Sequence, residues 1–372
     1  MTAQNTNSGI SRRAALQAGL AVATAPLLQF AGGTAWAQPA APARKATKVL
    51  DFITGADVPK AEQEGEVVFY THDSEPAGAA IIEAFAKDFP KIKGSYVRAQ
   101  TGALYSKVIA ERSAGRYTVD VIQFSDTATG LDFQKKGGYM RYVSPQVDAY
   151  APEHLSNPVG DYFWIGLTIV GISYNTDKVK ADEAPKNWKD LLNPRWKNVM
   201  SVKQSTSGTQ FAQWYELRRM YGEGFWKEFA KQRPRGFDSR AQIFDRLAKG
   251  DDKVCAMAEY AGYLLQKEKG SPLAFVSPPD GLVGAALVNG VADKAPHPEA
   301  AKLFVDWLMS PRGQALYQNN KFLYYASVRK DAPPMPGGVK LRDFKLLIPA
   351  DMAAFTASQP TFLKEWNGML GL

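Results

Sequence analysis

The fold class follows from residues 67–122, which read VVFYTHDSEPAGAAIIEAFAKDFPKIKGSYVRAQTGALYSKVIAERSAGRYTVDVI. Two segments in this stretch carry apolar residues at helical spacing, and they end at Pro90 and Gly115. Three short runs rich in β-branched and aromatic residues read as strands. These runs are residues 67–70, 96–98 and 119–122. The alternation of strands and helices predicts a parallel, doubly wound sheet.

A second set of strands and helices follows between about residues 190 and 280. Two further β-rich stretches, 165–175 and 283–291, lie where the chain would cross from one set to the other. We therefore predict an α/β fold of two doubly wound lobes joined by two crossover strands. The expected parts are lobe 1 at 65–165, completed by about 285–325, lobe 2 at 175–284, and a C-terminal segment at 326–372 that packs across the lobes.

The N-terminal residues have the pattern of an export signal. Residues 1–50 contain no Asp or Glu, and Ser11-Arg12-Arg13 precedes an apolar run that is rich in alanine. Ala35-Trp36-Ala37 then provides a small-residue cleavage pattern. The paired arginines indicate twin-arginine export to the periplasm, although Ala14-Ala15-Leu16-Gln17 departs from that consensus and leaves Sec export open. We expect residues 1–37 to be a cleaved signal peptide and residues 38–64 to be a leader.

The composition excludes several classes of protein and site. The 372 residues include one cysteine and three histidines, so an internal disulfide and a cysteine-based zinc site are excluded. The formal net charge of +8 is a mild excess, which a solvated surface explains without nucleic acid. The lone Cys255 lies inside an apolar strand pattern, so we interpret it as a buried residue. The sequence predicts no cofactor.

Several segments of the chain, in order, resemble the periplasmic solute-binding proteins of bacterial ABC importers, in the group of ferric-iron, phosphonate and sugar-phosphate binders. The resemblance covers roughly residues 65–330. It is carried by residues 67–71, 84–90, 119–121, 170–176, 188–196, 207–209 and 300–314, where 170–176 reads VGISYNT and 310–314 reads SPRGQ.

This resemblance implies a type II periplasmic-binding fold that closes over a small-molecule ligand and delivers it to an ABC permease without chemistry. We expect a monomer that binds no nucleic acid. Two other functions stay open. One is an exported enzyme on the same bilobal scaffold, and the other is a binding protein that docks on a chemoreceptor.

The ligand of such a fold binds at the carboxyl ends of the strands, where polar loops face the cleft. The sequence has polar loops at several of these positions. The candidate ligand-binding residues are Thr71, His72, Asp73, Thr101, Gly102, Ser125, Asp126, Ser205, Thr206, Ser207, Gly208, Thr209, Glu259, Tyr260 and Tyr263.

The segment Ser205 to Thr209 lies between a predicted strand and a predicted helix. A helix start presents unpaired N–H groups, and serine and threonine hydroxyls add donors, so this segment suits a phosphate, phosphonate or carboxylate. In relatives this loop does hold an anion. Asp126 or Glu259 would then meet an amine on the same ligand. A small anionic ligand is therefore our preferred prediction.

Ferric iron is the alternative ligand within the same family. Iron-binding relatives offer a histidine on the first loop, a glutamate after the third strand and two adjacent tyrosines. His72 matches this pattern, but Ser125 stands at the glutamate position beside Asp126, and the tyrosines are separated as Tyr260 and Tyr263. If iron binds, the expected ligands are His72, Asp126, Tyr260 and Tyr263, although no metal site is preferred.

Overall fold

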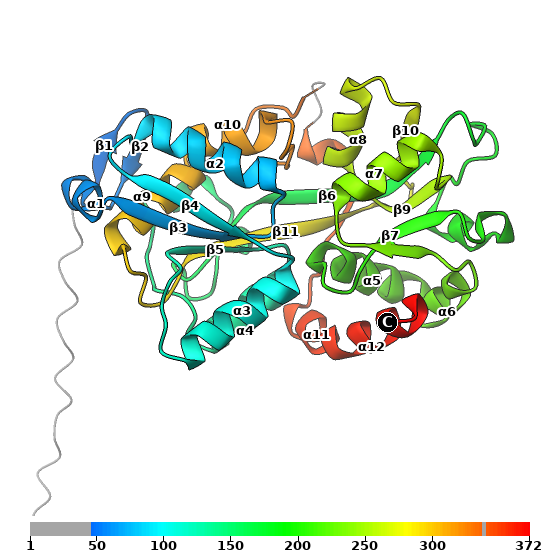
Figure 1. The fold of residues 1–372 in the computed structure, drawn as a ribbon, viewed down its shortest axis with the longest axis horizontal. Helices are drawn as coiled ribbons and strands as arrows, with labels where there is room; N and C mark the ends of the chain where they lie inside the picture. The colour runs from blue at the N-terminus through cyan, green and yellow to red at the C-terminus, as the bar shows by residue number, and fades with distance from the viewer. Residues whose placement is uncertain (1–45, 337–339) are drawn as a thin grey trace, which may run out of the picture. The chain divides into compact units, whose positions relative to one another are not determined.

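The computed structural model describes residues 46–336 and 340–372, and the expected signal peptide lies outside them. The described residues form one compact unit, and most of its strands make one mixed sheet in the order β4-β3-β5-β11-β6-β9-β7-β8, while the strands at residues 47–49 and 52–54 form a separate two-stranded sheet. The middle of this sheet consists of β6 (Phe163–Asn175) and β11 (Leu282–Val291), which pair antiparallel. Figure 1 shows both strands running between a left-hand and a right-hand group of elements. These are the two crossover strands that the sequence predicts.

The left-hand group, which we call lobe 1, contains the strands that decided the fold class. The strands β3, β4 and β5 pair in parallel, with β3 in the middle. Its elements are β1 (Thr47–Val49), β2 (Phe52–Thr54), α1 (Val58–Glu64), β3 (Glu66–Thr71), α2 (Glu75–Asp88), β4 (Lys93–Arg98), α3 (Thr101–Ser113), β5 (Val121–Phe124), α4 (Thr127–Lys135), α9 (Pro298–Met309) and α10 (Pro311–Asn319).

The right-hand group, lobe 2, repeats this design. The strand β7 pairs in parallel with β8 on one side and with β9 on the other, and helices cover both faces (Figure 1). Its elements are β7 (Met200–Lys203), α5 (Gly208–Tyr221), α6 (Gly224–Ala230), β8 (Arg235–Phe237), α7 (Arg240–Lys249), β9 (Val254–Glu259), α8 (Tyr260–Glu268) and β10 (Leu273–Val276). Short 3-10 turns complete the chain at Val147–Ala149, Pro152–His154, Trp188–Leu192, Pro194–Trp196 and Leu341–Asp343.

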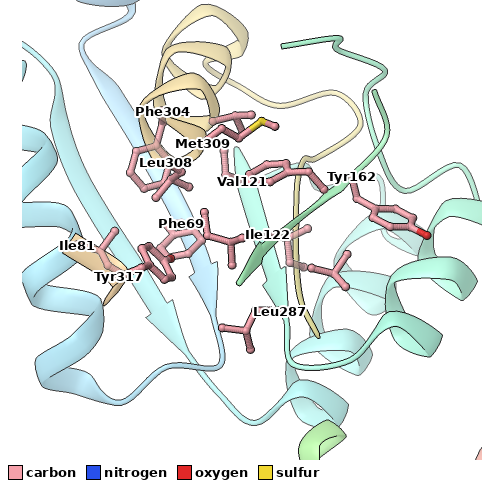
Figure 2. Close-up of a cluster of buried hydrophobic side chains, with 14 of the residues drawn as sticks. Phe69, Ile81, Val121, Ile122, Tyr162, Leu287, Phe304, Leu308, Met309 and Tyr317 are labelled. Carbon is pink, nitrogen blue, oxygen red and sulfur yellow. The ribbon is translucent and has the colours of Figure 1, made fainter. Parts of the chain in front are cut away.

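Each lobe has its own hydrophobic core. In lobe 1, Phe69 of β3 and Val121 of β5 lie under α9, where Phe304 packs on the Phe69 ring at a centroid distance of 5.4 Å (Figure 2). In lobe 2, a separate cluster gathers around Trp188 and Trp214, which are both fully buried. Separate cores let each lobe hold its shape while the crossover strands connect them.

The segment before β3 differs from the leader that the sequence suggested. Residues 47–64 form β1, β2 and α1, and α1 packs on α9. The Thr54 hydroxyl donates to the buried Asp306 carboxylate at 2.6 Å, and the Gly55 N–H donates to the same oxygen at 3.0 Å. Three-residue strands carry no readable periodicity, so the sequence pattern gave no signal for them.

The start of the third strand also differs from the prediction. The sequence placed it at Val119, whereas β5 begins at Val121. The reason is Asp120, whose buried carboxylate accepts the N–H groups of Val68 and His297, both at 2.8 Å. These bonds hold the segment next to β3 without a regular strand ladder.

The C-terminal segment adds β12 (Leu346–Leu347), α11 (Met352–Ala357) and α12 (Gln359–Leu370). Phe355 of α11 stacks on Phe211 of α5 at 4.3 Å, and the Thr127 hydroxyl of α4 contacts the sulfur of Met352 at 3.1 Å. The helix α11 therefore contacts both lobes. Within residues 46–336 and 340–372, none of the helices is long and apolar enough to cross a membrane.

Candidate functional site

A cavity of about 230 Å³ lies between the lobes, where the carboxyl ends of strands from both lobes meet. Its inner part is lined by charged and hydroxyl side chains. From lobe 1 and the crossover strand β6 these are His72, Asp73, Ser74, Arg98, Gln100, Ser125, Thr168 and Tyr325, and from lobe 2 they are Lys203, Ser207, Thr209, Ser239, Arg240 and Glu259. The cleft that the sequence predicts is therefore present.

Lys203 and Arg240 meet the same carboxylate in the cleft, that of Glu259. Lys203 Nζ contacts one carboxylate oxygen of Glu259, and Arg240 lies 3.2 Å from the other. Burial alone would raise the pKa of Glu259, but these two positive charges outweigh it and lower the pKa to about 2. Glu259 therefore stays ionised and holds both cations at the ligand cavity.

Arg98 is the last residue of β4, and unlike Lys203 and Arg240 it is not paired with a carboxylate among the described residues. Its Nε donates to the main-chain carbonyl of Asp73 at 3.2 Å. In the described part of the chain, its terminal guanidinium nitrogens form no hydrogen bond or ion pair. Because it lines the cavity, this guanidinium presents a bidentate donor face to whatever enters.

Two threonine hydroxyls are also available to a ligand. Thr168 lies on the floor of the cleft in β6, and Thr209 lies in the first turn of α5. Each side chain belongs to a residue that is only 3% exposed, yet within residues 46–336 and 340–372 neither hydroxyl has a hydrogen-bond partner. Both residues line the cavity, so these hydroxyls can donate to a molecule that enters it.

Asp73 is fully engaged by neutral donors. Its carboxylate accepts the Tyr325 hydroxyl at 2.6 Å, the Gln123 amide at 2.7 Å and the Thr71 hydroxyl at 2.9 Å. His72 beside it accepts from Gln123 at 3.1 Å, and burial, more than its charged neighbours, lowers the pKa of His72. This network shapes the lobe 1 wall and leaves Asp73 no oxygen without a donor.

The structure brings some of the predicted residues together in the cleft and not others. Those that line the cavity are His72, Asp73, Ser125, Ser207, Thr209 and Glu259. The remaining residues lie outside the lining, and these are Thr71, Thr101, Gly102, Asp126, Ser205, Thr206, Gly208, Tyr260 and Tyr263. Several of them form hydrogen bonds within the protein instead. The Thr101 hydroxyl is hydrogen-bonded to the Ser125 hydroxyl at 2.8 Å, and the Ser205 hydroxyl donates to the Asn367 side chain at 2.5 Å.

The two carboxylates that we expected to bind an amine on the ligand, Asp126 and Glu259, both bind other groups of the protein. Asp126 caps α4, where its carboxylate accepts the N–H and the hydroxyl of Thr129 at 2.7 and 3.0 Å. Glu259 is neutralised by Lys203 and Arg240. The cleft therefore offers an incoming amine neither of these two carboxylates.

The structure does not assemble the iron ligand set. Tyr260 and Tyr263 pack on Phe275, at ring-centroid distances of 5.1 and 5.5 Å, and Asp126 is the α4 cap. Only His72 of the four lines the cavity. Among the residues that the structure describes, no group of three or more His, Cys, Asp or Glu side chains is placed to hold a metal ion.

Sequence reasoning missed the cations of the site. Arg98 ends β4 and Lys203 ends β7, while Arg240 follows the Ser239 cap of α7. A positively charged residue at the carboxyl end of a predicted strand was the available signal. Tyr325 also lines the cleft, whereas its neighbour Tyr324 does not.

Comparisons with known proteins agree with this geometry. The family model of the bacterial extracellular solute-binding proteins matches residues 118–345. An uncharacterized protein of Haemophilus influenzae is 27% identical over 279 residues, covering 69% of this chain and 76% of its own. Iron uptake protein A1 of Synechocystis is 26% identical over 255 residues, covering 63% of this chain and 68% of its own.

Solved structures share the fold. The periplasmic binding protein AfuA from Actinobacillus pleuropneumoniae, with fructose-6-phosphate bound, superposes with a TM-score of 0.75 at 21% identity, over 83% of this chain and 99% of its own. Iron-bound HitA from Pseudomonas aeruginosa gives a TM-score of 0.69 at 19% identity, over 82% and 99%. Both the predicted type II periplasmic-binding fold and the predicted family are thereby confirmed: the chain belongs to the bacterial extracellular solute-binding proteins, the substrate-binding components of ABC transporters.

Proposed function

We propose that this solute-binding protein captures a small organic anion of the phosphate, phosphonate or carboxylate type and delivers it unaltered to its permease. The observation that carries the proposal is a set of donor groups at the cavity that have no partner among the described residues, namely the terminal guanidinium nitrogens of Arg98 and the hydroxyls of Thr168 and Thr209. A cationic guanidinium and hydroxyl donors that line the same cavity are suited to anionic oxygens, because charge-assisted hydrogen bonds are the strongest available in a partly dry cleft.

The start of α5 adds to this set. Ser207 is the N-cap of α5, and its hydroxyl accepts the N–H of Gln210 at 3.3 Å. Its own hydroxyl hydrogen and the N–H groups of Gly208 and Thr209 have no partner among the described residues, and the positive end of the helix dipole favours an anion there. Donors from lobe 1 and from lobe 2 would therefore bind the same anionic group.

Contacts from both lobes to one ligand give the binding mechanism. A ligand that bonds Arg98 in lobe 1 and Thr209 in lobe 2 stabilises the state in which the lobes are close together, and so shifts the population toward closure. We infer that lobe 1 and lobe 2 move as units about β6 and β11. The closed form would then be the one that docks on the permease.

Two further points belong to the proposal. The N-terminal pattern supports export through the twin-arginine pathway with removal of residues 1–37, and we expect the protein to act as a monomer. Cys255 does not offer a nucleophile to the cleft, since it is fully buried in β9 and burial raises the pKa of its thiol to about 12.

Ferric iron is the competing ligand, because iron-bound HitA shares the fold and iron uptake protein A1 is a relative. A thermal-shift panel of alkyl phosphates, phosphonates, carboxylates and ferric citrate separates the two. A ligand at a hundred times its Kd adds about 2.7 kcal/mol of stability, a visible shift in Tm.

We expect organic anions to raise the Tm, and NMR to recover them unchanged after incubation. A tyrosinate-to-iron charge-transfer band with ferric citrate, together with no response to any organic anion, would overturn the proposal in favour of iron. Product formation in the NMR sample would favour the exported enzyme.

A further inference from the structure

The cleft continues beyond the charged inner part into a second region with different chemistry. This outer part lies between α7, α8 and the loop after α10, and Ala241 at its mouth is exposed. Its apolar lining consists of Ala241, Phe244, Gly262, Leu265 and Phe322. The lining of one cavity therefore changes from charged to largely apolar along its length.

The polar groups of the outer part are mostly occupied by each other. Gln266 Nε2 donates to the Asp245 carboxylate at 3.1 Å, and Gln266 Oε1 accepts the Ser271 hydroxyl at 2.7 Å. Lys269 lies at the solvent-exposed end. A ligand arm that carries several hydroxyl groups would find few partners here, and a hydroxyl that loses water without a partner costs affinity.

The walls of the outer part are held by close packing. A side chain at Gly262 would overlap the Phe244 ring, so α8 can approach α7 only because residue 262 is a glycine. Phe244 is 2% exposed, and it belongs to a small core cluster with Ile243 and Leu247. The apolar wall is therefore a fixed surface, which favours ligands that match it in advance.

We propose that the ligand is an amphipathic anion, in which a phosphate, phosphonate or carboxylate head occupies the inner part and a short apolar arm lies in the outer part. This inference rests on the proposed anion binding in the same cleft and narrows it. It favours alkyl or aryl phosphates and phosphonates over inorganic anions and over polyhydroxylated phosphates. The head supplies charge-assisted hydrogen bonds, and the arm supplies the hydrophobic contribution.

Calorimetry with three probes of one head group tests the inference. The probes are methyl phosphate, n-propyl phosphate and glycerol 1-phosphate, of which the last two have arms of equal length. A buried methylene contributes about a fourfold gain in affinity, so n-propyl phosphate should bind at least about tenfold more tightly than methyl phosphate. It should also bind more tightly than glycerol 1-phosphate.

A matched pair of variants locates the effect. Leu265 lines the outer part, whereas its neighbour Leu264 on the same helix does not, and both are partly buried. Leu265→Asn should reduce the ratio of n-propyl to methyl phosphate affinity by several-fold, and Leu264→Asn should leave this ratio as in the wild type.

The outcomes separate this inference from the proposed function. If the three phosphates bind equally, or if glycerol 1-phosphate binds best, the amphipathic ligand is wrong while anion binding stands. If none of them binds, and phosphonates and carboxylates do not bind either, the proposed function fails, and this inference fails with it. Since the wild-type comparison alone decides between these outcomes, a variant that misfolds does not leave the inference untested.

Discussion

The backbone N–H of Gly102 in lobe 1 donates to the carbonyl oxygen of Thr206 in lobe 2 at 3.2 Å. Close by, the Gln100 side chain donates to the carbonyl oxygen of Asp238 at 2.5 Å. These bonds join the lobes directly and involve no ligand atom. Loop residues that sequence reasoning assigned to the ligand, Gly102 and Thr206 among them, thus form a lobe–lobe contact at the edge of the cleft.

Removing one of these bonds should favour the open state. In Gln100→Ala the bond to Asp238 is lost, and a net hydrogen bond is worth about 0.5–1.5 kcal/mol, so affinity for n-propyl phosphate should fall about two- to tenfold. Gln242→Ala, which removes an exposed glutamine of α7, is the control. Equal affinity in Gln100→Ala, Gln242→Ala and the wild type by calorimetry would show that the contact does not contribute to closure.

Thr209 offers a test of the anion site with little effect on the fold. Its hydroxyl has no partner among the described residues, so Thr209→Val keeps the shape of the side chain and removes only a donor. We expect a loss of about 1.5–3 kcal/mol in the binding free energy of the anion and an almost unchanged Tm. Ser207→Ala should weaken binding and also cost about 1 kcal/mol of stability, because Ser207 caps α5.

Thr176→Val serves as the control for Thr209→Val, since the Thr176 side chain is exposed and lies away from the cavity. If Thr209→Val binds the anion with wild-type affinity, Thr209 does not bind the ligand.

Gly208 tests whether the lobes must approach closely at α5. A side chain there would overlap the Asp126 carboxylate and lie 2.7 Å from the Ser125 hydroxyl, both of which belong to lobe 1. Gly208→Ala should therefore hold the lobes apart, lower the affinity and increase the radius of gyration of the ligand-saturated protein in small-angle scattering. Gly224→Ala, where the added carbon meets nothing within 4 Å, is the matched control. Identical scattering and affinity in both variants would contradict the account.

Replacing Glu259 should lower the stability of the fold and raise the affinity for an anion. The pKa of Glu259 is lowered to about 2, below its ordinary value of 4.5, so its stabilising contribution is complete above pH 4.5 and is lost as the pH falls toward 2. Glu259→Gln leaves Lys203 and Arg240 without their counter-charge and should cost roughly 3–5 kcal/mol at pH 6. The difference in unfolding free energy from the wild type should shrink as the pH falls through this window.

The same substitution should increase anion affinity, because it removes a negative charge from the cleft. Urea unfolding from pH 6 to pH 2.5 and calorimetry at pH 7 measure the two effects. Glu228→Gln, which breaks only an exposed pair with Lys231, should change neither quantity. If the difference in unfolding free energy between the wild type and Glu259→Gln does not change with pH, the pairing of Glu259 with Lys203 and Arg240 is contradicted.

The sequence predicted most of the fold because local signals and global topology agree. The apolar residues at helical spacing correctly predicted α2 and α3, which end before Pro90 and Gly115. The crossover strands β6 and β11 are buried along their whole length, so they appear as continuous apolar runs. Short elements such as β1 and β2 have no such period, and they form because α9 and Asp306 provide a surface for them.

The site was only partly predictable for a different reason. Loop positions follow from strand ends, so His72, Ser125 and Ser207 were found. The direction in which a side chain points depends on packing that the sequence does not display. Tyr260 and Tyr263 lie about one turn apart in α8, and the face that they share packs on Phe275 and does not line the cleft.

Arg98 carries the central claim, because among the cations of the inner part of the cavity, within the described residues, it is the one that no carboxylate neutralises. The most direct test is a calorimetric titration of Arg98→Met with n-propyl phosphate, beside the exposed control Arg116→Met and the wild type. The account predicts a loss of about 10- to 150-fold in affinity for Arg98→Met alone. Equal affinities in all three proteins would contradict the claim that this cleft binds its ligand as an anion.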